Sequence, residues 1–274
     1  MADRLAECRP VGRVSYDHSG RVVLVTGGCN GIGRAVCEAF HASGATVICA
    51  DVDDSAGSQL PAGIRYVHCD TGSETSCADA VRWCCEVTGA IDVLVNNAAI
   101  QPPSSYVALT DVGSDAYHRM VAVNLSGYHF MAKHVLPVMQ RQGSGVIVNM
   151  ASGQGHRTAR QVPVYGPIKA ANILQAMQWG VEYARQGIRV VSVSPGAIDT
   201  PLVRAGLEAQ GGAAELANRH PLGRIGRPEE VAQAVLWLSS TDASFITATD
   251  LSVDGGLGAF GAFADPYPLP ATEC

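Results

Sequence analysis

Short apolar runs rich in β-branched residues alternate along the chain with longer segments in which apolar residues recur every three or four positions. The short runs have the length of strands, and the longer segments have the length and period of helices. Strands are predicted at Val22–Val25, Thr46–Ala50, Arg65–His68, Val93–Val95, Val146–Met150, Val190–Val193 and Thr249–Val253. Helices are predicted at Gly33–Ser43, Ser73–Val87, Asp115–Gln140, Ala170–Arg185 and Glu229–Ser239. This alternation predicts an α/β fold with a doubly wound parallel sheet, helices on both faces, and ligands at the carboxyl ends of the strands.

The composition favours one globular domain. Hydrophobic residues make up 47% and charged residues 16% of the 274 positions, which excludes extended disorder. No Pro/Gly/Ser-rich linker divides the pattern. We expect one domain at 21–258, with a lid at about 200–224, between an N-terminal extension at 1–20 and a C-terminal tail at 259–274.

Charge, hydropathy and cysteine usage narrow the function further. The net charge of −6 is spread along the chain without a Lys/Arg cluster, so nucleic acid is not an expected partner. No apolar run has the length of a membrane span, and the first twenty residues lack the apolar segment of a secretory signal. The nine cysteines, an odd number, show no CxxC or Cys/His spacing. We therefore predict a cytoplasmic protein with free buried thiols, no metal site and no membrane partner.

A glycine-rich segment, Thr26–Gly33 (TGGCNGIG), directly follows the first predicted strand and opens the first helix. Glycines at this position allow backbone to approach a pyrophosphate, whose charge suits a helix N-terminus. The spacing differs from GxGxxG, so the segment alone also fits a ligand-free turn.

The second predicted strand is followed by Asp51. An acidic side chain at this point can accept hydrogen bonds from the adenosine ribose of NAD and would repel the extra phosphate of NADP. An Asp in this place could equally cap the next turn. Neither Asn30 nor Val52 supplies the cation that an NADP phosphate would need. Together with the glycine-rich segment, Asp51 favours NAD as the cofactor.

Further motifs follow in a fixed order: Asn96-Asn97-Ala98-Ala99, then Asn124, Ser152, Tyr165-Gly166-Pro167-Ile168-Lys169, and Pro195-Gly196 with Thr200. With the glycine-rich segment they resemble the TGxxxGxG, NNAG, Ser–YxxxK and PG motifs of the classical short-chain dehydrogenase/reductase family, over about residues 20–256. The resemblance implies a single Rossmann-like domain with a seven-stranded parallel sheet. It implies catalytic roles for Asn124, Ser152, Tyr165 and Lys169. It implies cofactor binding by Gly27, Asn30, Gly31, Ile32, Gly33, Asp51, Asp70, Asn97, Ala98, Tyr165, Lys169, Pro195, Gly196, Ile198 and Thr200.

The residue types suit proton and hydride transfer. A free tyrosine has a pKa of about 10, too high for a good base near neutrality. Lys169 lies one helical turn from Tyr165, so its charge can favour the phenolate. Tyr165 would then exchange a proton with the alcohol while hydride passes to the nicotinamide, and Ser152 would bind the substrate oxygen. By resemblance, Asn124 would hold a water that links Lys169 to solvent. Pro167 is tolerated only in a first helical turn, so the helix is expected to begin close to Tyr165.

These features predict an NAD-dependent oxidoreductase that interconverts a secondary alcohol and a ketone. One alternative is an NADPH-dependent ketoreductase like the 3-oxoacyl reductases, which Asp51 disfavours. Another is a catalytically silent NAD-binding regulator, which the intact Ser152, Tyr165 and Lys169 disfavour. A dehydratase or epimerase of the extended branch would carry another glycine spacing. The substrate stays open among a polyol or sugar, a steroid or other cyclic alcohol, and an aryl or terpene alcohol. Its pocket is expected to include Gln101–Tyr106, Gly153–Gly155, the lid and the tail.

The expected partners are a small-molecule alcohol or ketone and further copies of the chain. Family members of this size commonly pair through the two long helices, which predicts a homo-oligomer, specifically a homotetramer. Both helices also carry apolar residues on more than one side, as at Val135, Leu136, Val138 and Met139. Apolar tail residues are expected to cover a substrate cleft, namely Phe260, Phe263, Tyr267 and Leu269.

Overall fold

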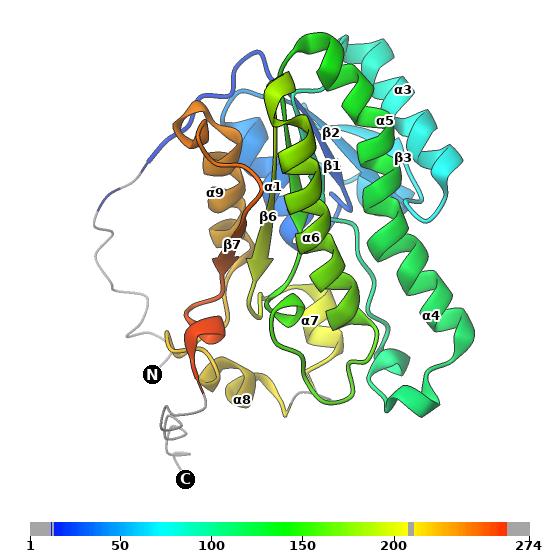
Figure 1. The fold of residues 1–274 in the computed structure, drawn as a ribbon, viewed down its shortest axis with the longest axis vertical. Helices are drawn as coiled ribbons and strands as arrows, with labels where there is room; N and C mark the ends of the chain where they lie inside the picture. Colours follow the sequence, from blue (N-terminus) through cyan, green and yellow to red (C-terminus); the bar gives the residue numbers. More distant parts are fainter. Residues whose placement is uncertain (1–11, 13, 208–210, 262–274) are drawn as a thin grey trace.

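The computed structural model describes residues 12, 14–207 and 211–261, and this part of the chain forms a single seven-stranded parallel sheet covered by helices (Figure 1). The strand order is β3-β2-β1-β4-β5-β6-β7. The strands are β1 (Val22–Thr26), β2 (Thr46–Asp51), β3 (Arg65–His68), β4 (Val93–Asn96), β5 (Gly145–Met150), β6 (Ile188–Pro195) and β7 (Asp250–Val253). The α-helices are α1 (Gly31–Ala42), α2 (Asp54–Gly57), α3 (Glu74–Thr88), α4 (Ser114–Val121), α5 (Gly127–Gln142), α6 (Tyr165–Tyr183), α7 (Pro201–Ala205), α8 (Ala213–Asn218) and α9 (Pro228–Ser239). The predicted α/β fold with a doubly wound parallel sheet is confirmed, and each predicted strand ends within two residues of its observed bounds.

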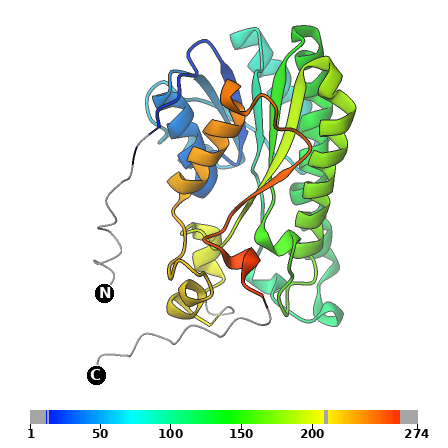
Figure 2. The same ribbon diagram turned by 60° about the vertical axis from the view of Figure 1, so that its left-hand side comes forward.

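Helices cover the sheet on both faces, which explains why the strands read as continuous apolar runs (Figure 2). Val23 and Val25 of β1 pack in the core that α1 and α9 cover. Val22 and Leu24, which point the other way, pack in the core under α3, α5 and α6. Alternate residues of one strand therefore supply two separate cores.

The long helix predicted over Asp115–Gln140 is helical throughout, but a π-helical turn that was not predicted, η4 (Ala122–Ser126), divides it into α4 and α5. The amide side chain of Asn124 explains the interruption, because it pairs with the backbone of Ile100: Oδ1 accepts from the Ile100 N–H at 2.8 Å and Nδ2 donates to the Ile100 carbonyl at 2.7 Å. The Asn124 carbonyl in turn accepts from Asn172 Nδ2 at 3.1 Å. The extra residue in this turn is thus tied to both neighbouring segments.

Helix α6 begins at Tyr165, five residues before the predicted start at Ala170. The expectation that the helix begins close to Tyr165 is confirmed. The first backbone hydrogen bond runs from the Ile168 N–H to the Val164 carbonyl at 3.2 Å, so the missing N–H of Pro167 costs no helical bond. Tyr165 and Lys169 consequently occupy the first turns of a rigid helix.

The apolar residues at 135, 136, 138 and 139 do not support an oligomer. All four are buried within the chain itself, in the core that α3, α5 and α6 share. The expectation based on them is therefore wrong, because α5 packs against both the sheet and the neighbouring α3 and needs more than one apolar face. Helix α6, by contrast, carries three exposed apolar residues, Leu174, Met177 and Val181.

The described end of the predicted N-terminal extension belongs to the core. His18 is 3% exposed, and its ring packs edge-on against Phe40 with centroids 5.0 Å apart. Its backbone N–H donates to the Ser43 carbonyl at 2.7 Å. Among the described residues, no helix combines the length and apolarity that a membrane crossing requires.

Candidate active site

The carboxyl ends of the strands open into a cavity of about 730 Å³. Its walls bring together fifteen of the residues predicted for the site, although they come from seven separate segments of the chain. They are Gly27, Asn30, Gly31, Ile32, Asp51, Asp70, Asn97, Ala98, Ser152, Tyr165, Lys169, Pro195, Gly196, Ile198 and Thr200. Gly33 and Asn124 were also predicted but do not line this cavity, and both are buried behind it.

The glycine-rich loop is shaped by two residues without side chains. Gly27 has a φ of +63°, and a Cβ at this position would stand 2.8 Å from Ala98 Cα. A Cβ on Gly33 would stand 2.1 Å from the Gly27 carbonyl oxygen. Asn97 fixes the same loop, since its Nδ2 donates to the carbonyls of Thr26 and Gly27 at 3.0 Å each. The loop therefore leads directly into α1, whose N-terminus can hold an anionic group.

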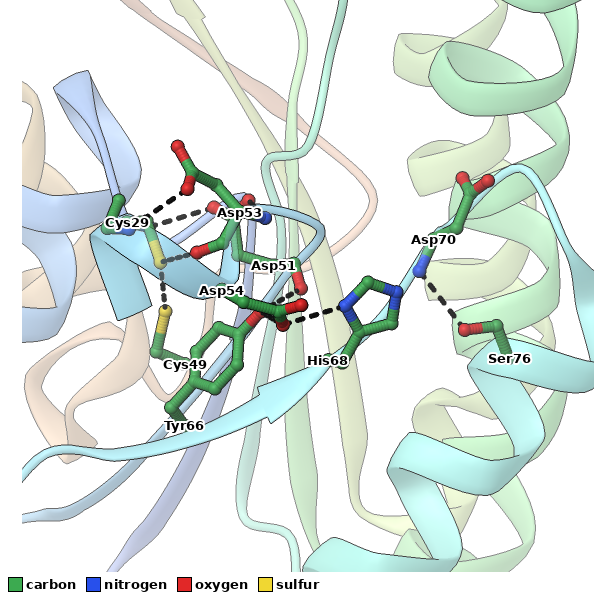
Figure 3. A network of polar contacts seen from close by, with 10 residues as sticks. Cys29, Cys49, Asp51, Asp53, Asp54, Tyr66, His68, Asp70 and Ser76 are labelled. Atoms are coloured by element: carbon green, nitrogen blue, oxygen red, sulfur yellow. Dashed lines mark hydrogen bonds and ion pairs between the residues drawn. The ribbon is translucent and has the colours of Figure 1, made fainter. Parts of the chain in front are cut away.

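Asp51 ends β2 opposite this loop and is part of the cavity wall (Figure 3). Its Oδ2 accepts from the Cys29 N–H at 2.9 Å, and its Oδ1 accepts from the Asp53 N–H at 3.1 Å. Two backbone donors thus orient a carboxylate that stays half-exposed to the cavity. This arrangement suits a ligand that offers hydroxyl donors and disfavours an added phosphate.

Asp70 faces the cavity with its carboxylate already paired. Arg119 of α4 donates to both of its oxygens at 3.1 Å, and Gly72 N–H donates to Oδ1 at 2.9 Å. Burial tends to raise the pKa of Asp70, but these hydrogen bonds outweigh burial and hold the pKa below its ordinary value. Asp70 is consequently a fixed acceptor near neutral pH.

Thr200 and Ser152 each use their hydroxyl to begin a helical segment. Thr200 Oγ1 accepts from the Val203 N–H at 3.3 Å and so caps α7. Ser152 Oγ accepts from the Gln154 N–H at 3.1 Å, at the start of the 3₁₀ turn η5 (Gly153–Gly155). Both hydroxyls are held at the cavity wall by local backbone.

Lys169 is buried directly behind Tyr165. Its Nζ lies 5.5 Å from the centroid of the Tyr165 ring and donates to the Met150 carbonyl at 2.7 Å. Burial lowers the pKa of Lys169 to about 7 and raises the pKa of Tyr165 above its ordinary value. The expected lowering of the Tyr165 pKa is therefore not seen in this structure, because burial disfavours the ammonium and the phenolate alike.

Tyr128 of α5 is a neighbour of Lys169 that the sequence reasoning missed. Its side chain is 1% exposed, and its hydroxyl donates to the Met150 carbonyl at 2.9 Å. The same hydroxyl accepts a hydrogen bond from Lys169 Nζ at 3.1 Å, so it is a second acceptor for the ammonium beside the Met150 carbonyl. No motif in the sequence marked Tyr128, because α5 mixes apolar and polar residues throughout.

His220 is a second missed residue, inside the predicted lid. It is 2% exposed, its Nδ1 donates to the Leu216 carbonyl at 2.9 Å, and its Nε2 accepts from the Ala197 N–H at 3.0 Å. It thereby joins α8 to the turn that follows β6. No spacing pattern marked it, because its partners lie on backbone far apart in the sequence.

The outer part of the cavity is mostly apolar. Its wall includes Tyr106, Leu202, Leu216, Leu257 and Phe260, and the segments predicted to form it all contribute. Arg157 links two of them, since its Nη1 donates to the Phe260 carbonyl at 3.0 Å. The other tail residues predicted to cover the cleft, Phe263, Tyr267 and Leu269, lie outside the described residues.

Comparison with known proteins identifies this arrangement. A family model of short-chain dehydrogenases, described as enoyl-(acyl carrier protein) reductase, matches residues 27–258. The chain belongs to the short-chain dehydrogenase/reductase family. It is accordingly an oxidoreductase with a fold that binds a nicotinamide cofactor.

Relatives in this family act on several kinds of substrate. A cis-4-hydroxycyclohexanecarboxylate dehydrogenase of Sinomonas cyclohexanicum is 40% identical, over 86% of this chain and 96% of the relative. A 2,5-dichloro-2,5-cyclohexadiene-1,4-diol dehydrogenase of Sphingobium indicum is 35% identical, over 89% of this chain and 99% of the relative. The structure of a 3-ketoacyl-(acyl carrier protein) reductase of Brucella melitensis complexed with NADH is 29% identical, with a TM-score of 0.81 over 88% of this chain and 99% of the other.

We predict that Tyr128→Phe lowers the free energy of unfolding by about 1–3 kcal/mol, because the Lys169 ammonium loses an acceptor in a buried site. Urea denaturation measures this change. Tyr117→Phe is the control, since Tyr117 is 47% exposed and its substitution should change stability by less than about 0.5 kcal/mol. Equal stability of the two variants would contradict a structural role for the Tyr128 hydroxyl.

Proposed function

We propose that this protein is an NAD-dependent dehydrogenase that interconverts a cyclic secondary alcohol and its ketone. The observation that carries the proposal is one cavity lined by the glycine-rich loop, Asp51, Ser152, Tyr165 and Lys169. A dinucleotide site and an acid/base group in one cavity are what hydride transfer from an alcohol requires.

In this proposal each residue has a defined task. The N-terminus of α1 binds the pyrophosphate, and Asp51 accepts hydrogen bonds from the adenosine ribose. Thr200 and the turn after β6 bind the carboxamide end of the cofactor. A nicotinamide held there would supply the acceptor for the hydride of the alcohol, or the donor for the ketone.

Proton transfer falls to the buried group around Tyr165. Ser152 binds the substrate oxygen, and Tyr165 takes the hydroxyl proton in oxidation or gives a proton in reduction. Lys169 holds a positive charge behind the ring below pH of about 7 and loses it above that value. Asn124 would contribute through its carbonyl, by holding a water on the path from Lys169 to solvent.

The apolar outer wall supports a cyclic alcohol as substrate. Leu202, Leu216, Leu257 and Phe260 offer contacts to ring carbons. The names of two relatives, a hydroxycyclohexanecarboxylate dehydrogenase and a cyclohexadiene diol dehydrogenase, point to the same class. A 3-oxoacyl reductase is the second candidate, supported by the similarity to the Brucella enzyme. We further propose that the protein acts in the cytoplasm, where its buried thiols stay reduced.

The proposed activity can be tested with a panel of cyclohexanols, linear secondary alcohols, hexoses and 3-hydroxyacyl thioesters. We expect NAD⁺ reduction to be fastest with the cyclohexanols.

The Tyr165→Phe variant should keep NADH affinity within about threefold yet lose more than 90% of kcat, because it keeps the ring and loses the exchangeable proton. A variant that retained a tenth of wild-type kcat or more would show that Tyr165 is not the acid/base.

The cofactor preference depends on Asp51. We expect kcat/KM for NAD⁺ to exceed that for NADP⁺ at least tenfold, equivalent to about 1.4 kcal/mol. Asp51→Ala should lower the ratio of kcat/KM for NAD⁺ to kcat/KM for NADP⁺, since it removes a ribose acceptor and a charge that repels phosphate. Asp53→Ala is the matched control. Asp53 carries an equal charge two residues from Asp51, and its own side chain caps α2. If both variants kept the wild-type ratio, Asp51 would not select the cofactor.

We also propose that the chain forms a homo-oligomer, specifically a tetramer, through α6. Leu174, Met177 and Val181 share one face of α6 and are 66%, 36% and 74% exposed. Light scattering should give the mass of a tetramer for the native chain and a smaller mass for the Leu174→Asp/Val181→Asp double variant. Leu109→Asp, at a residue 76% exposed in a loop, should leave the mass unchanged. A monomeric native chain at assay concentration would refute the proposal.

A further inference from the structure

The thiols of Cys29 and Cys49 lie together with the Asp51 carboxylate at the glycine-rich loop (Figure 3). Cys29 Sγ of the loop lies 3.5 Å from Cys49 Sγ of β2. The ligand atoms of Cys29, Cys49 and Asp51 all lie within 4.8 Å of one another. Cys37 of α1 adjoins them, since a Cβ built on Gly28 would stand 2.7 Å from Cys49 Sγ and 2.9 Å from Cys37 Sγ. Residues that are far apart in the sequence thus form one cluster, which no spacing motif in the sequence predicted.

The thiols of this cluster have few other polar contacts. Cys29 Sγ reaches the Asp53 carbonyl at 3.8 Å, which is a weak contact. Burial raises the pKa of the Cys29 thiol, and the Cys37 thiol together with burial raises that of Cys49. Both groups are therefore protonated at neutral pH and are poor nucleophiles. This environment disfavours attack on a disulfide or peroxide, but it does not prevent displacement of the protons by a metal ion.

The geometry matches the donor set of a soft divalent cation. Thiolate sulfur with one carboxylate oxygen is a ligand combination that Zn²⁺ accepts. Two sulfurs bound to one zinc at about 2.3 Å in a tetrahedron stand roughly 3.8 Å apart. The observed separation of 3.5 Å between Cys29 Sγ and Cys49 Sγ lies close to that value. Asp51 lines the open cavity, so an ion can reach the sulfurs by way of its carboxylate.

We propose that Cys29, Cys49 and Asp51 form a binding site for a thiophilic divalent cation, Zn²⁺ or Cd²⁺, and that the bound ion excludes the dinucleotide. Each thiol gives its proton to solvent as its sulfur coordinates the ion, and no electron is transferred. Cys37 adjoins Cys49 but is not one of the three residues whose ligand atoms converge. The second half of the proposal rests on the proposed role of Asp51, because the ion takes up the carboxylate that would receive the adenosine ribose.

A cadmium titration of the full, reduced, metal-free chain tests the site directly. We expect one Cd²⁺ per chain by calorimetry, together with a sulfur-to-cadmium charge-transfer absorption equivalent to two thiolates. Cys49→Ala should weaken binding at least tenfold and reduce the absorption. Cys77→Ala is the control, because Cys77 belongs to a separate buried thiol pair with Cys69 and should leave both readouts unchanged.

Two results would overturn the site. One is a native chain that binds Cd²⁺ without a thiolate absorption, and the other is a Cys49→Ala variant that binds as tightly as the native chain. Cys29→Ala provides a second variant should Cys49→Ala fail to fold, and its circular dichroism spectrum checks that the fold is intact.

The exclusion of cofactor is measured by NADH fluorescence in the presence and absence of saturating Cd²⁺. We expect saturating Cd²⁺ to raise the NADH dissociation constant of the native chain at least tenfold, and a chelator to restore its starting value. In Cys49→Ala the same Cd²⁺ concentration should raise the NADH dissociation constant much less. Unchanged NADH affinity in a cadmium-loaded chain would overturn the exclusion. A metal-free chain that bound no NADH would instead refute the proposed function, while the cadmium absorption would still decide the site.

Discussion

The structure around the cavity depends on one close contact, where the start of α1 meets the turn after β1. A Cβ on Gly33 would stand 2.1 Å from the Gly27 carbonyl oxygen, so no side chain can be accommodated there. The same carbonyl accepts a hydrogen bond from Asn97, which follows β4. Strands β1 and β4 and helix α1 are therefore fixed to one another at a single point. The opening of the cavity, the direction of α1 and the position of Asp51 follow from that contact.

A second constraint is the burial of Lys169. A lysine that is 1% exposed loses its hydration, and the low pKa of about 7 reflects that loss. Two oxygen acceptors, the Met150 carbonyl and the Tyr128 hydroxyl, offset part of the cost. The ammonium is therefore retained only because β5 and α5 present these acceptors. A substitution on α5 can alter the charge behind Tyr165 without touching the cavity.

The sequence predicted the sheet and most of the cavity for physical reasons that are local. Strands buried on both faces produce the apolar runs, and the functional residues follow the strand ends directly, as Asp51 and Ser152 do. The break at Asn124 was missed because an amide that pairs with the distant Ile100 backbone leaves no periodic signal. Tyr128 and His220 were missed for the same reason, since their partners are carbonyl or N–H groups whose positions depend on the tertiary fold. The apolar residues of α5 were misread because a helix that packs against both the sheet and a neighbouring helix needs more than one apolar face, and periodicity alone cannot tell such a helix from an oligomer interface.

The substrate wall and the cofactor turn are connected through one buried histidine. Leu216 lines the outer cavity, and its carbonyl accepts from His220 Nδ1. On the other side, His220 Nε2 accepts from the Ala197 N–H, next to Gly196, where a Cβ would stand 2.8 Å from that nitrogen. Because one ring nitrogen donates and the other accepts, only the neutral imidazole with its proton on Nδ1 satisfies both contacts. A displacement of α8 must therefore move the turn after β6 or leave a buried backbone N–H unpaired, at a cost of about 1–3 kcal/mol. The segment predicted as a lid is thus tied, by a ring that the sequence did not mark, to the residues that would hold the nicotinamide end of the cofactor.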